Sequence, residues 1–202
     1  MSRYTGPKAR INRRLGGMIF ESAGAMRATD RRPQPPGMAP PPRKLSKYGE
    51  SMREKQKIKY YYGLGEKQLH RMYAKAQRQA GNTGENLLLL CERRLDSAVR
   101  LAGFAKTRPQ ARQGVGHGHF ILNGHRTDIA SALVKAGDVI YVKRKAQLTD
   151  MYRDLLAAGE GGSADWLSVD TEKLQITVLR LPTVADITLP VDVGVVVELL
   201  SR

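Results

Sequence analysis

The chain has 202 residues, and its 34 Lys and Arg against 19 Asp and Glu give it a formal net charge of +15. This length is enough for one or two domains with a hydrophobic core, and the charge favours a polyanionic partner, nucleic acid rather than an acidic membrane surface. The single cysteine, Cys91, excludes an intramolecular disulfide framework. No apolar stretch reaches the roughly 20 residues of a membrane-spanning helix, and the first residues lack the apolar segment of a secretory signal.

The charge is unevenly distributed along the chain. Residues 1–80 carry 19 basic and 5 acidic side chains, residues 93–145 carry 11 and 3, and residues 146–202 carry 4 and 9. A polyanion is therefore expected to bind upstream of residue 146. The acidic C-terminal segment is expected to face solvent or neighbouring proteins.

Residues 1–45 are basic and rich in Gly and Pro, with PQPPGMAPPPRK near their end. Proline at this density opposes helix and central strand. The segment is predicted to be an extended arm that becomes ordered when phosphates neutralise its charge.

Residues 46–81 predict two helices, capped by Ser46, separated by Gly63-Leu64-Gly65 and ended by Gly81. The adjacent Tyr60, Tyr61 and Tyr62 follow a lysine-rich turn of helix. These rings either stack on unpaired bases or pack in the protein with their hydroxyls outward. The sequence leaves both interpretations open.

An apolar stripe of leucines and valine predicts another helix, which begins near Thr83 or Gly84 and ends at Gly103. Cys91 lies in this stripe, which favours a buried structural thiol over a nucleophile. A following helix is predicted from Thr107 as N-cap, with Pro109 in its first turn. Because Gly114 and Gly116 disfavour helix, it is expected to end near Gln113.

Arg108 and Arg112 lie four residues apart, near the positive end of that helix dipole. They form either a phosphate site or an ordinary solvated basic face.

Asn123-Gly124, between alternating apolar residues, predicts a type I′ hairpin. The turn sets Leu122 opposite His125 and Ile121 opposite Arg126. The predicted core face then holds Phe120, Leu122, Thr127 and Ile129, while His117, His119 and Arg126 lie on the solvated face.

Gly137-Asp138 predicts another turn, and VIYVK predicts a strand that leads into Lys143, Arg144 and Lys145. Further along, a helix is expected near residues 148–158, and KLQITVLRLP and VGVVVELL predict short strands or covering segments. Trp166 is expected to be buried against the helices of residues 46–90.

Three histidines within nine residues, His117, His119 and His125, raise the possibility of a metal site. Side chains alternate across a strand, so at most two of the three converge. We therefore expect no metal site and favour RNA contact or simple exposure.

Five segments together resemble the bacterial-type family of small-subunit ribosomal protein four. They are YTGPKARINRRLG, SMREKQKIKYYYG, TGENLLLLCERRLD, GHFILNG and the closing VELLSR, in order over nearly the whole length. The resemblance implies an α+β protein with an extended basic arm (1–45), a helical region (46–92) completed by the acidic segment 146–202, and a small RNA-binding module (93–145). In that module, two or three helices pack on a short, mostly antiparallel sheet.

The resemblance implies a structural constituent of the small ribosomal subunit, on bacterial or plastid ribosomes in the cytoplasm or plastid. It further implies that the protein binds the 5′ domain of the 16S-type rRNA directly and nucleates assembly there. Its expected partners also include neighbouring ribosomal proteins, and it is expected to lie near the mRNA entry channel and to influence translational accuracy. Many relatives hold zinc through cysteines in the arm, but this arm has none, so no cofactor is expected.

Two alternatives remain: a free-standing RNA chaperone, and an RNA-modifying enzyme that uses the same module. Arg94-Leu95-Asp96 resembles the segment around the catalytic aspartate of pseudouridine synthases. No catalytic domain follows it, so Asp96 is interpreted as structural and no enzymatic activity is expected.

The predicted RNA-contact residues are cations for phosphate and polar side chains for hydrogen bonds. They are Arg3, Lys8, Arg10, Arg13, Arg14, Arg53, Lys55, Arg94, Arg108, Gln110, Arg112, His117, His119, Asn123 and Arg126.

Overall fold

The structure is a computed structural model that describes residues 4–38, 45–159 and 164–201. It divides into two compact units, Met1–Leu87 with Leu189–Arg202, and Leu88–Thr188. The division falls inside helix α5 (Thr83–Glu92). No helix among the described residues is long and apolar enough to span a bilayer.

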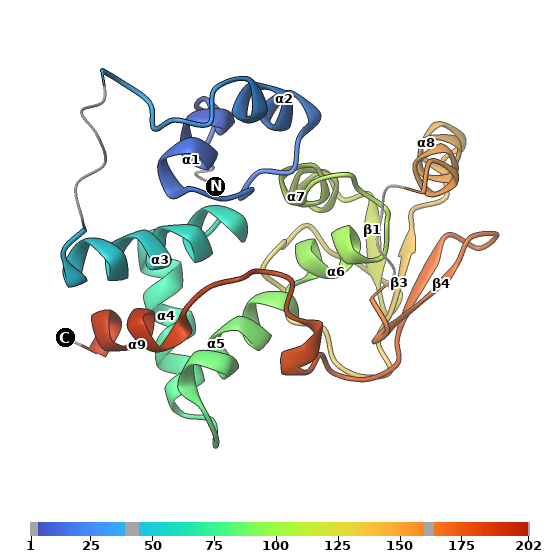
Figure 1. Cartoon of the computed structure of the whole chain (residues 1–202). Helices are drawn as coiled ribbons and strands as arrows, with labels where there is room; N and C mark the ends of the chain where they lie inside the picture. The colour runs from blue at the N-terminus through green and yellow to red at the C-terminus, as the bar shows by residue number, and fades with distance from the viewer. Residues whose placement is uncertain (1–3, 39–44, 160–163, 202) are drawn as a thin grey trace. The chain divides into compact units, whose positions relative to one another are not determined.

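The first unit is helical (Figure 1). Its elements are α1 (Lys8–Leu15), α2 (Ala23–Arg31), α3 (Lys47–Tyr61), α4 (Glu66–Gln77), the start of α5, and α9 (Val193–Ser201). The Ser46 hydroxyl accepts a hydrogen bond from the Gly49 N–H at 3.2 Å, which confirms the predicted N-cap. Gly63, with φ 61°, follows α3 and allows the tight turn to α4. Helix α4 ends at Gln77, four residues before the predicted Gly81.

The predicted extended arm contains two helices, so that prediction was wrong for residues 8–15 and 23–31. Ile11, Leu15 and Phe20 are buried in the helical unit, and this burial of apolar side chains outweighs the Gly- and Pro-rich composition. Residues 32–38 form neither helix nor strand. The rest of the proline run, residues 39–44, lies outside the described residues.

The C-terminal valine run forms helix α9, so of the two expectations, a short strand or a covering segment, the strand was wrong. Packing decides the outcome: Val196 is fully buried, and Val193 lies against Gly84 of α5. A Cβ on Gly84 would come within 2.6 Å of the Val193 Cγ1 atom. Gly84 therefore permits the close approach of the two helices.

The second unit contains a five-stranded antiparallel sheet in the order β2-β1-β3-β5-β4. Its strands are β1 (Phe120–Leu122), β2 (His125–Arg126), β3 (Val139–Val142), β4 (Leu167–Asp170) and β5 (Gln175–Val178), and its helices are the end of α5, α6 (Leu95–Leu101), α7 (Arg108–Gly116), α8 (Ala146–Ala157) and the 3₁₀ helix η1 (Val184–Asp186). Helices α6 and α7 lie on one side of β1 and β3 (Figure 1). The architecture confirms the predicted α+β class.

The hairpin forms with the predicted register, Leu122 opposite His125 and Ile121 opposite Arg126. Asn123 and Gly124 have φ of 50° and 84°, as a type I′ turn requires. The core face was predicted incorrectly at Ile129, which is 58% exposed. Because β2 ends at Arg126, the alternation of faces does not continue to residue 129.

The long helix predicted from Thr83 to Gly103 is instead two helices, α5 and α6. Arg94 between them is extended (φ −70°, ψ 144°) and forms a bridge with Leu133. The Leu95 N–H donates to the Ala132 carbonyl at 2.8 Å, which replaces helical bonding at this point. Periodicity did not reveal the break because the apolar spacing continues through it.

Residues 146–188 belong to the sheet unit rather than to the helical region, so only residues 189–202 complete the helical unit. Trp166 is fully buried, as predicted, but in the core of the sheet unit with residues such as Phe104 and Ile176. Helix α8 begins two residues before its predicted start.

Helix α7 runs to Gly116 rather than ending near Gln113. Its N-cap prediction is confirmed, since the Thr107 hydroxyl accepts from the Gln110 N–H. Gly114 is needed for packing: a Cβ there would lie 2.8 Å from the Tyr152 hydroxyl and 3.2 Å from the Phe120 ring. At exposed Gly116, an added Cβ meets nothing within 4 Å.

Two alanine substitutions in α7 should therefore have opposite effects. We expect Gly114→Ala to lower the free energy of unfolding by about 1–3 kcal/mol, since overpacking outweighs its gain in helix propensity. Gly116→Ala should raise it by up to about 1 kcal/mol. Urea unfolding followed by the fluorescence of the single tryptophan, Trp166, measures both, and equal effects would contradict the packing role of Gly114.

Candidate nucleic-acid interface

A basic groove of about 460 Å³ lies in the helical unit, between α1 and α3. Arg14 of α1 and Arg53 of α3 contribute to its lining, together with Lys59 and Tyr60. Arg14 is exposed and Arg53 is half-buried. Two guanidinium groups from different helices can bind successive phosphates of one strand.

The groove depends on a buried asparagine that fixes α1. Asn12 is fully buried, its Oδ1 accepts from the Phe20 N–H at 2.9 Å, and its Nδ2 donates to the Phe20 carbonyl at 3.1 Å. The chain after α1 is thereby folded back onto the helix. Arg10 and Arg14 remain on the exposed side of α1.

Two other predicted contacts in this unit have partners within the protein. The Lys8 Nζ lies 6.0 Å from the centroid of the Phe20 ring, a cation–π distance. The Arg13 Nε donates to the Gln34 carbonyl at 2.7 Å and so holds the start of the proline-rich segment. Arg3 lies outside the described residues.

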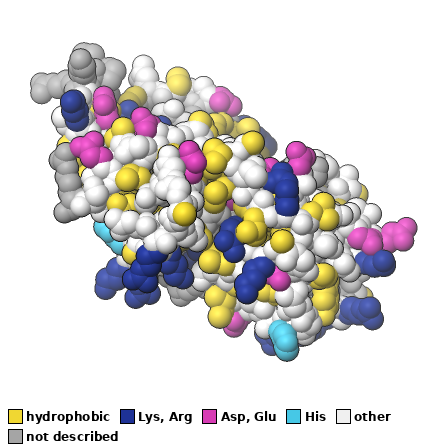
Figure 2. All heavy atoms as spheres, turned by 90° about the horizontal axis from the view of Figure 1, so that it is seen from below, with side chains coloured by type: hydrophobic (Ala, Val, Ile, Leu, Met, Phe, Trp, Pro, Cys, Tyr) yellow, Lys and Arg dark blue, Asp and Glu magenta, His cyan; other side chains and the backbone are white. Residues whose placement is uncertain are grey.

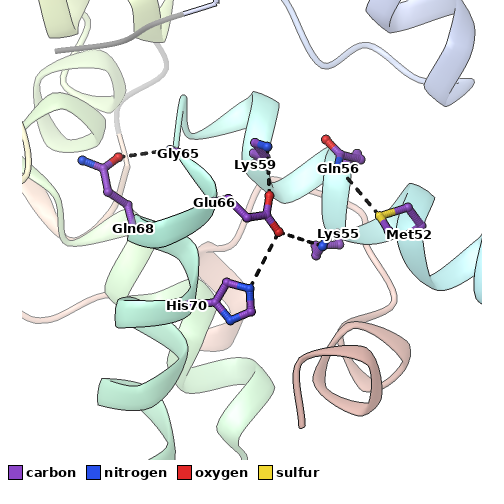
Figure 3. Close-up of polar contacts among 8 residues, drawn as sticks. All are labelled: Met52, Lys55, Gln56, Lys59, Gly65, Glu66, Gln68 and His70. Carbon is purple, nitrogen blue, oxygen red and sulfur yellow. Dashed lines mark hydrogen bonds and ion pairs between the residues drawn. The ribbon is translucent and has the colours of Figure 1, made fainter. Parts of the chain in front are cut away.

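Glu66 at the start of α4 binds two lysines of α3 (Figure 3). Its carboxylate oxygens lie 2.7 Å from the Lys55 Nζ and 2.9 Å from the Lys59 Nζ, and one lies 3.8 Å from the His70 Nε2. The hydrogen bond from Lys55, followed by that from Lys59, lowers the pKa of Glu66 from 4.5 to about 2. Lys55, a predicted RNA contact, is therefore held in the α3–α4 corner with a side chain only 11% exposed.

Sequence reasoning did not identify Glu66. The available signal was the acidic Glu66 directly after the Gly63–Gly65 turn. Before that turn, Lys55 and Lys59 are four residues apart and therefore lie on one face of the preceding helix. A short turn between two helices brings the start of the second close to the last turns of the first, where Lys55 and Lys59 lie.

The ion pairs of Glu66 should make the helical unit sensitive to acid. Its folded pKa lies below its unfolded value, so its stabilisation is present above about pH 4.5 and is lost as the pH falls toward 2. We expect Glu66→Gln to destabilise the protein at pH 7, with a difference from wild type that shrinks between pH 4.5 and 2. Urea unfolding followed by circular dichroism measures this, and a pH-independent difference would contradict the ion-pair role.

The three consecutive tyrosines pack within the protein. Tyr61 and Tyr62 are buried, with ring centroids 5.0 Å apart. Tyr60 packs edge-on against Tyr4 at 5.3 Å while also lining the basic groove. Of the two interpretations, packing holds for Tyr61 and Tyr62.

In the sheet unit, three of the predicted phosphate contacts are buried arginines. Arg94 is 2% exposed and binds Asp96 through two hydrogen bonds, of 2.9 Å and 2.7 Å. Arg112, 9% exposed, approaches the same carboxylate at 3.8 Å. Arg108, also 9% exposed, approaches both carboxylate oxygens of buried Glu92 at 3.4 Å.

These ion pairs connect the end of α5, α6 and α7. They give Arg94, Arg108 and Arg112 a structural role, so the phosphate site predicted at the start of α7 is largely neutralised by the protein itself. Asp96, bound by arginines and 4% exposed, is not available as a catalytic base. Cys91 is fully buried, and burial raises the pKa of its thiol, as expected for a structural cysteine.

Removing the carboxylate at residue 96 should be costly, because it leaves the Arg94 guanidinium buried without its counter-charge. We expect Asp96→Asn to reduce the free energy of unfolding by about 3–5 kcal/mol. Asp128→Asn, at an exposed carboxylate of the same unit, should change it by less than about 0.5 kcal/mol. Tryptophan fluorescence in urea measures both, and similar small values would show that the buried pair is dispensable.

The remaining predicted contacts lie at the two ends of α7, in the segment that follows it and in the hairpin. Gln110 and His117 are exposed. The Asn123 side chain is hydrogen-bonded within the protein. Its Nδ2 donates to the Asp138 carboxylate and its Oδ1 accepts from the Val139 N–H, both at 2.9 Å. Arg126 is exposed and lies over Gly118, where a Cβ would be 2.5 Å from the Arg126 Nε.

His117 and His119 have ring centroids 5.7 Å apart. The His119 Nδ1 lies 3.0 Å from the Tyr152 hydroxyl, and burial, with the nearby His117, lowers its pKa. Neutral His119 therefore has a hydrogen-bonding role inside the protein. Among the described residues, no group of three or more potential metal ligands is present.

Figure 2 shows one face of the molecule, on which Lys and Arg side chains form a dense group with few acidic side chains beside it. Exposed cations gathered in this way suit a polyanionic ligand.

Known proteins and family models match this chain along its whole length. A family model described as the ribosomal protein S4/S9 N-terminal domain matches residues 3–92, and a model of the S4 domain matches residues 93–140. The small ribosomal subunit protein uS4 of Rhodopirellula baltica is 57% identical over 202 residues, which cover both chains completely. The protein of the same name from Desulfitobacterium hafniense is 43% identical over 208 residues, again covering both chains.

Proposed function

Because the chain belongs to the family of small ribosomal subunit protein uS4, we propose that it is a structural constituent of the small ribosomal subunit that binds the subunit's rRNA directly. The observation that carries this proposal is the match along the whole length, which includes both units. The relatives are structural proteins of the ribosome, and this chain is likewise not an enzyme.

Binding follows from cations on folded elements that solvent can reach. In the helical unit these are exposed Arg10 and Arg14 and half-buried Arg53, and in the sheet unit exposed Arg126. Gln110 in the first turn of α7 and His117 just after its end add exposed hydrogen-bonding groups. Each phosphate contact releases condensed counterions, so affinity falls with salt. Rigid placement of these groups selects an RNA by shape, as is typical of structured RNA.

The proposal extends to a particular RNA region and cellular place. We infer that the protein binds the 5′ domain of the 16S-type rRNA, nucleates assembly there, lies near the mRNA entry channel and influences translational accuracy on a cytoplasmic bacterial ribosome. Bacterial relatives of full length support the bacterial setting. Neighbouring ribosomal proteins are the proposed partners of the acidic C-terminal segment.

The rival functions have less support. An RNA-modifying enzyme needs a positioned acid, base or nucleophile, and the aspartate of the Arg94-Leu95-Asp96 segment is held between arginines. A free-standing RNA chaperone would associate with ribosomes at less than one copy each, which the binding experiment below distinguishes through specificity.

The test is binding of the purified protein to a 5′-domain rRNA transcript, with an unrelated rRNA fragment of equal length as competitor. We expect a preference of about tenfold or more (about 1.4 kcal/mol) that persists at moderate salt. Arg14→Gln with Arg53→Gln should weaken binding about tenfold and reduce the magnitude of the log–log salt slope by about 1.5, as expected for two lost phosphate contacts.

The matched control is Arg71→Gln with Lys75→Gln, which removes the same charge from exposed positions of α4. If the control lowers affinity and slope equally, only net charge matters. Equal binding of both RNAs, lost together as salt rises, would contradict a preorganised site and favour the chaperone.

A further inference from the structure

The sheet unit has a groove of its own. Its volume is about 810 Å³, and it is lined by residues of β1, β3, β5, α8 and the β4–β5 turn. None of its lining residues belongs to the predicted RNA contacts. It is larger than the α1–α3 groove of the helical unit.

Strand register places an aromatic residue at this groove. Tyr141 pairs with Ile121 on β1 and with Gln175 on β5, so the three side chains share one face. Their chain neighbours Phe120, Ile140 and Ile176 are buried in the core on the opposite face. Tyr141 is half-buried and lines the groove with Ile121 and Gln175.

Cations from three segments surround this aromatic position. Lys143 and Arg144 follow β3, Arg153 comes from α8, and Lys173 lies in the β4–β5 turn. Glu172 is the one acidic residue in the lining. Lys173 pairs with Asp170 at 3.4 Å, whereas Lys143, Arg144 and Arg153 form no ion pair within the part of the chain that the structure describes.

The cations of this groove differ in their pairing from the arginines of α7 in the same unit. There Arg108 and Arg112 are buried against acidic side chains, while the groove cations keep their charge available to a ligand. The ligand must therefore be anionic, and the apolar and aromatic lining calls for a flat apolar group between its charges. An RNA strand has both features in each nucleotide, whereas an acidic peptide segment has only the charge.

We propose that this groove binds an unpaired RNA segment, with a base against Tyr141 and its phosphates on Lys143, Arg144 and Arg153. Aromatic rings flanked by cations are the usual platform for single-stranded nucleic acid. The inference rests on the proposed function only in that the segment would belong to the same rRNA. It adds a binding surface separate from the α1–α3 groove.

The test uses a uridine hexamer that contains 4-thiouridine, irradiated with the full-length protein at moderate salt, with crosslinks mapped by mass spectrometry. We expect the crosslink in the peptide that contains Tyr141. In anisotropy measurements, Tyr141→Leu should weaken hexamer binding about tenfold, the range found for loss of one base stack, and Tyr141→Phe should bind like wild type. Arg144→Gln with Arg153→Gln should also weaken it.

Two controls separate the outcomes. Arg14→Gln with Arg53→Gln should leave the Tyr141 crosslink unchanged even where it weakens binding of the 5′-domain transcript. The fluorescence of Trp166 checks that each variant is folded. The crosslink to the wild-type protein tests the groove even where a variant does not fold.

A hexamer that crosslinks elsewhere, or that binds Tyr141→Leu as well as wild type, would overturn the inference whether or not the transcript binds. If hexaglutamate displaces the hexamer equally well from wild type and Tyr141→Leu, the groove accepts acidic protein segments, and the inference is wrong.

Discussion

The ion pair between Arg94 and Asp96 constrains the whole sheet unit. A buried guanidinium is tolerated only beside a buried counter-charge, so Arg94 must lie at the start of α6, where the Asp96 carboxylate binds it at 2.7 Å and also accepts from the Ser97 N–H at 3.1 Å. The same carboxylate attracts Arg112 of α7. This one carboxylate therefore links α6 and α7, which also share the hydrophobic core of the unit.

The helical unit uses its few acidic residues in a similar way. Only five are found among residues 1–80, and two of them hold lysines: Glu66 binds Lys55 and Lys59, and Glu54 binds Lys57 at 2.6 Å. A protein with this excess of positive charge repels itself before its RNA arrives. Internal ion pairs reduce that repulsion, and they leave Arg14 and Arg53 for the ligand.

Local signals allowed accurate prediction where the interaction was local. The Asn123-Gly124 turn and the Ser46 and Thr107 caps depend on neighbouring residues. Burial of Arg94, Arg108 and Arg112 depends on carboxylates brought close by tertiary packing, so a sequence pattern shows only basic side chains near a helix start. The helical fold of the valine-rich C-terminus likewise depends on its contact with Gly84, more than a hundred residues away.

Two units that each carry a basic surface explain how modest individual contacts can give a specific complex. A groove with two arginines binds any phosphate chain weakly and loses affinity in salt. When a second surface on the same chain engages the same RNA, its binding becomes intramolecular, and the gain can reach about 10²–10⁴. That gain is available only to an RNA that reaches both surfaces at once. If both proposed surfaces bind one RNA, selectivity for a folded RNA needs no base-specific contact, since the shape of the RNA determines whether both units bind.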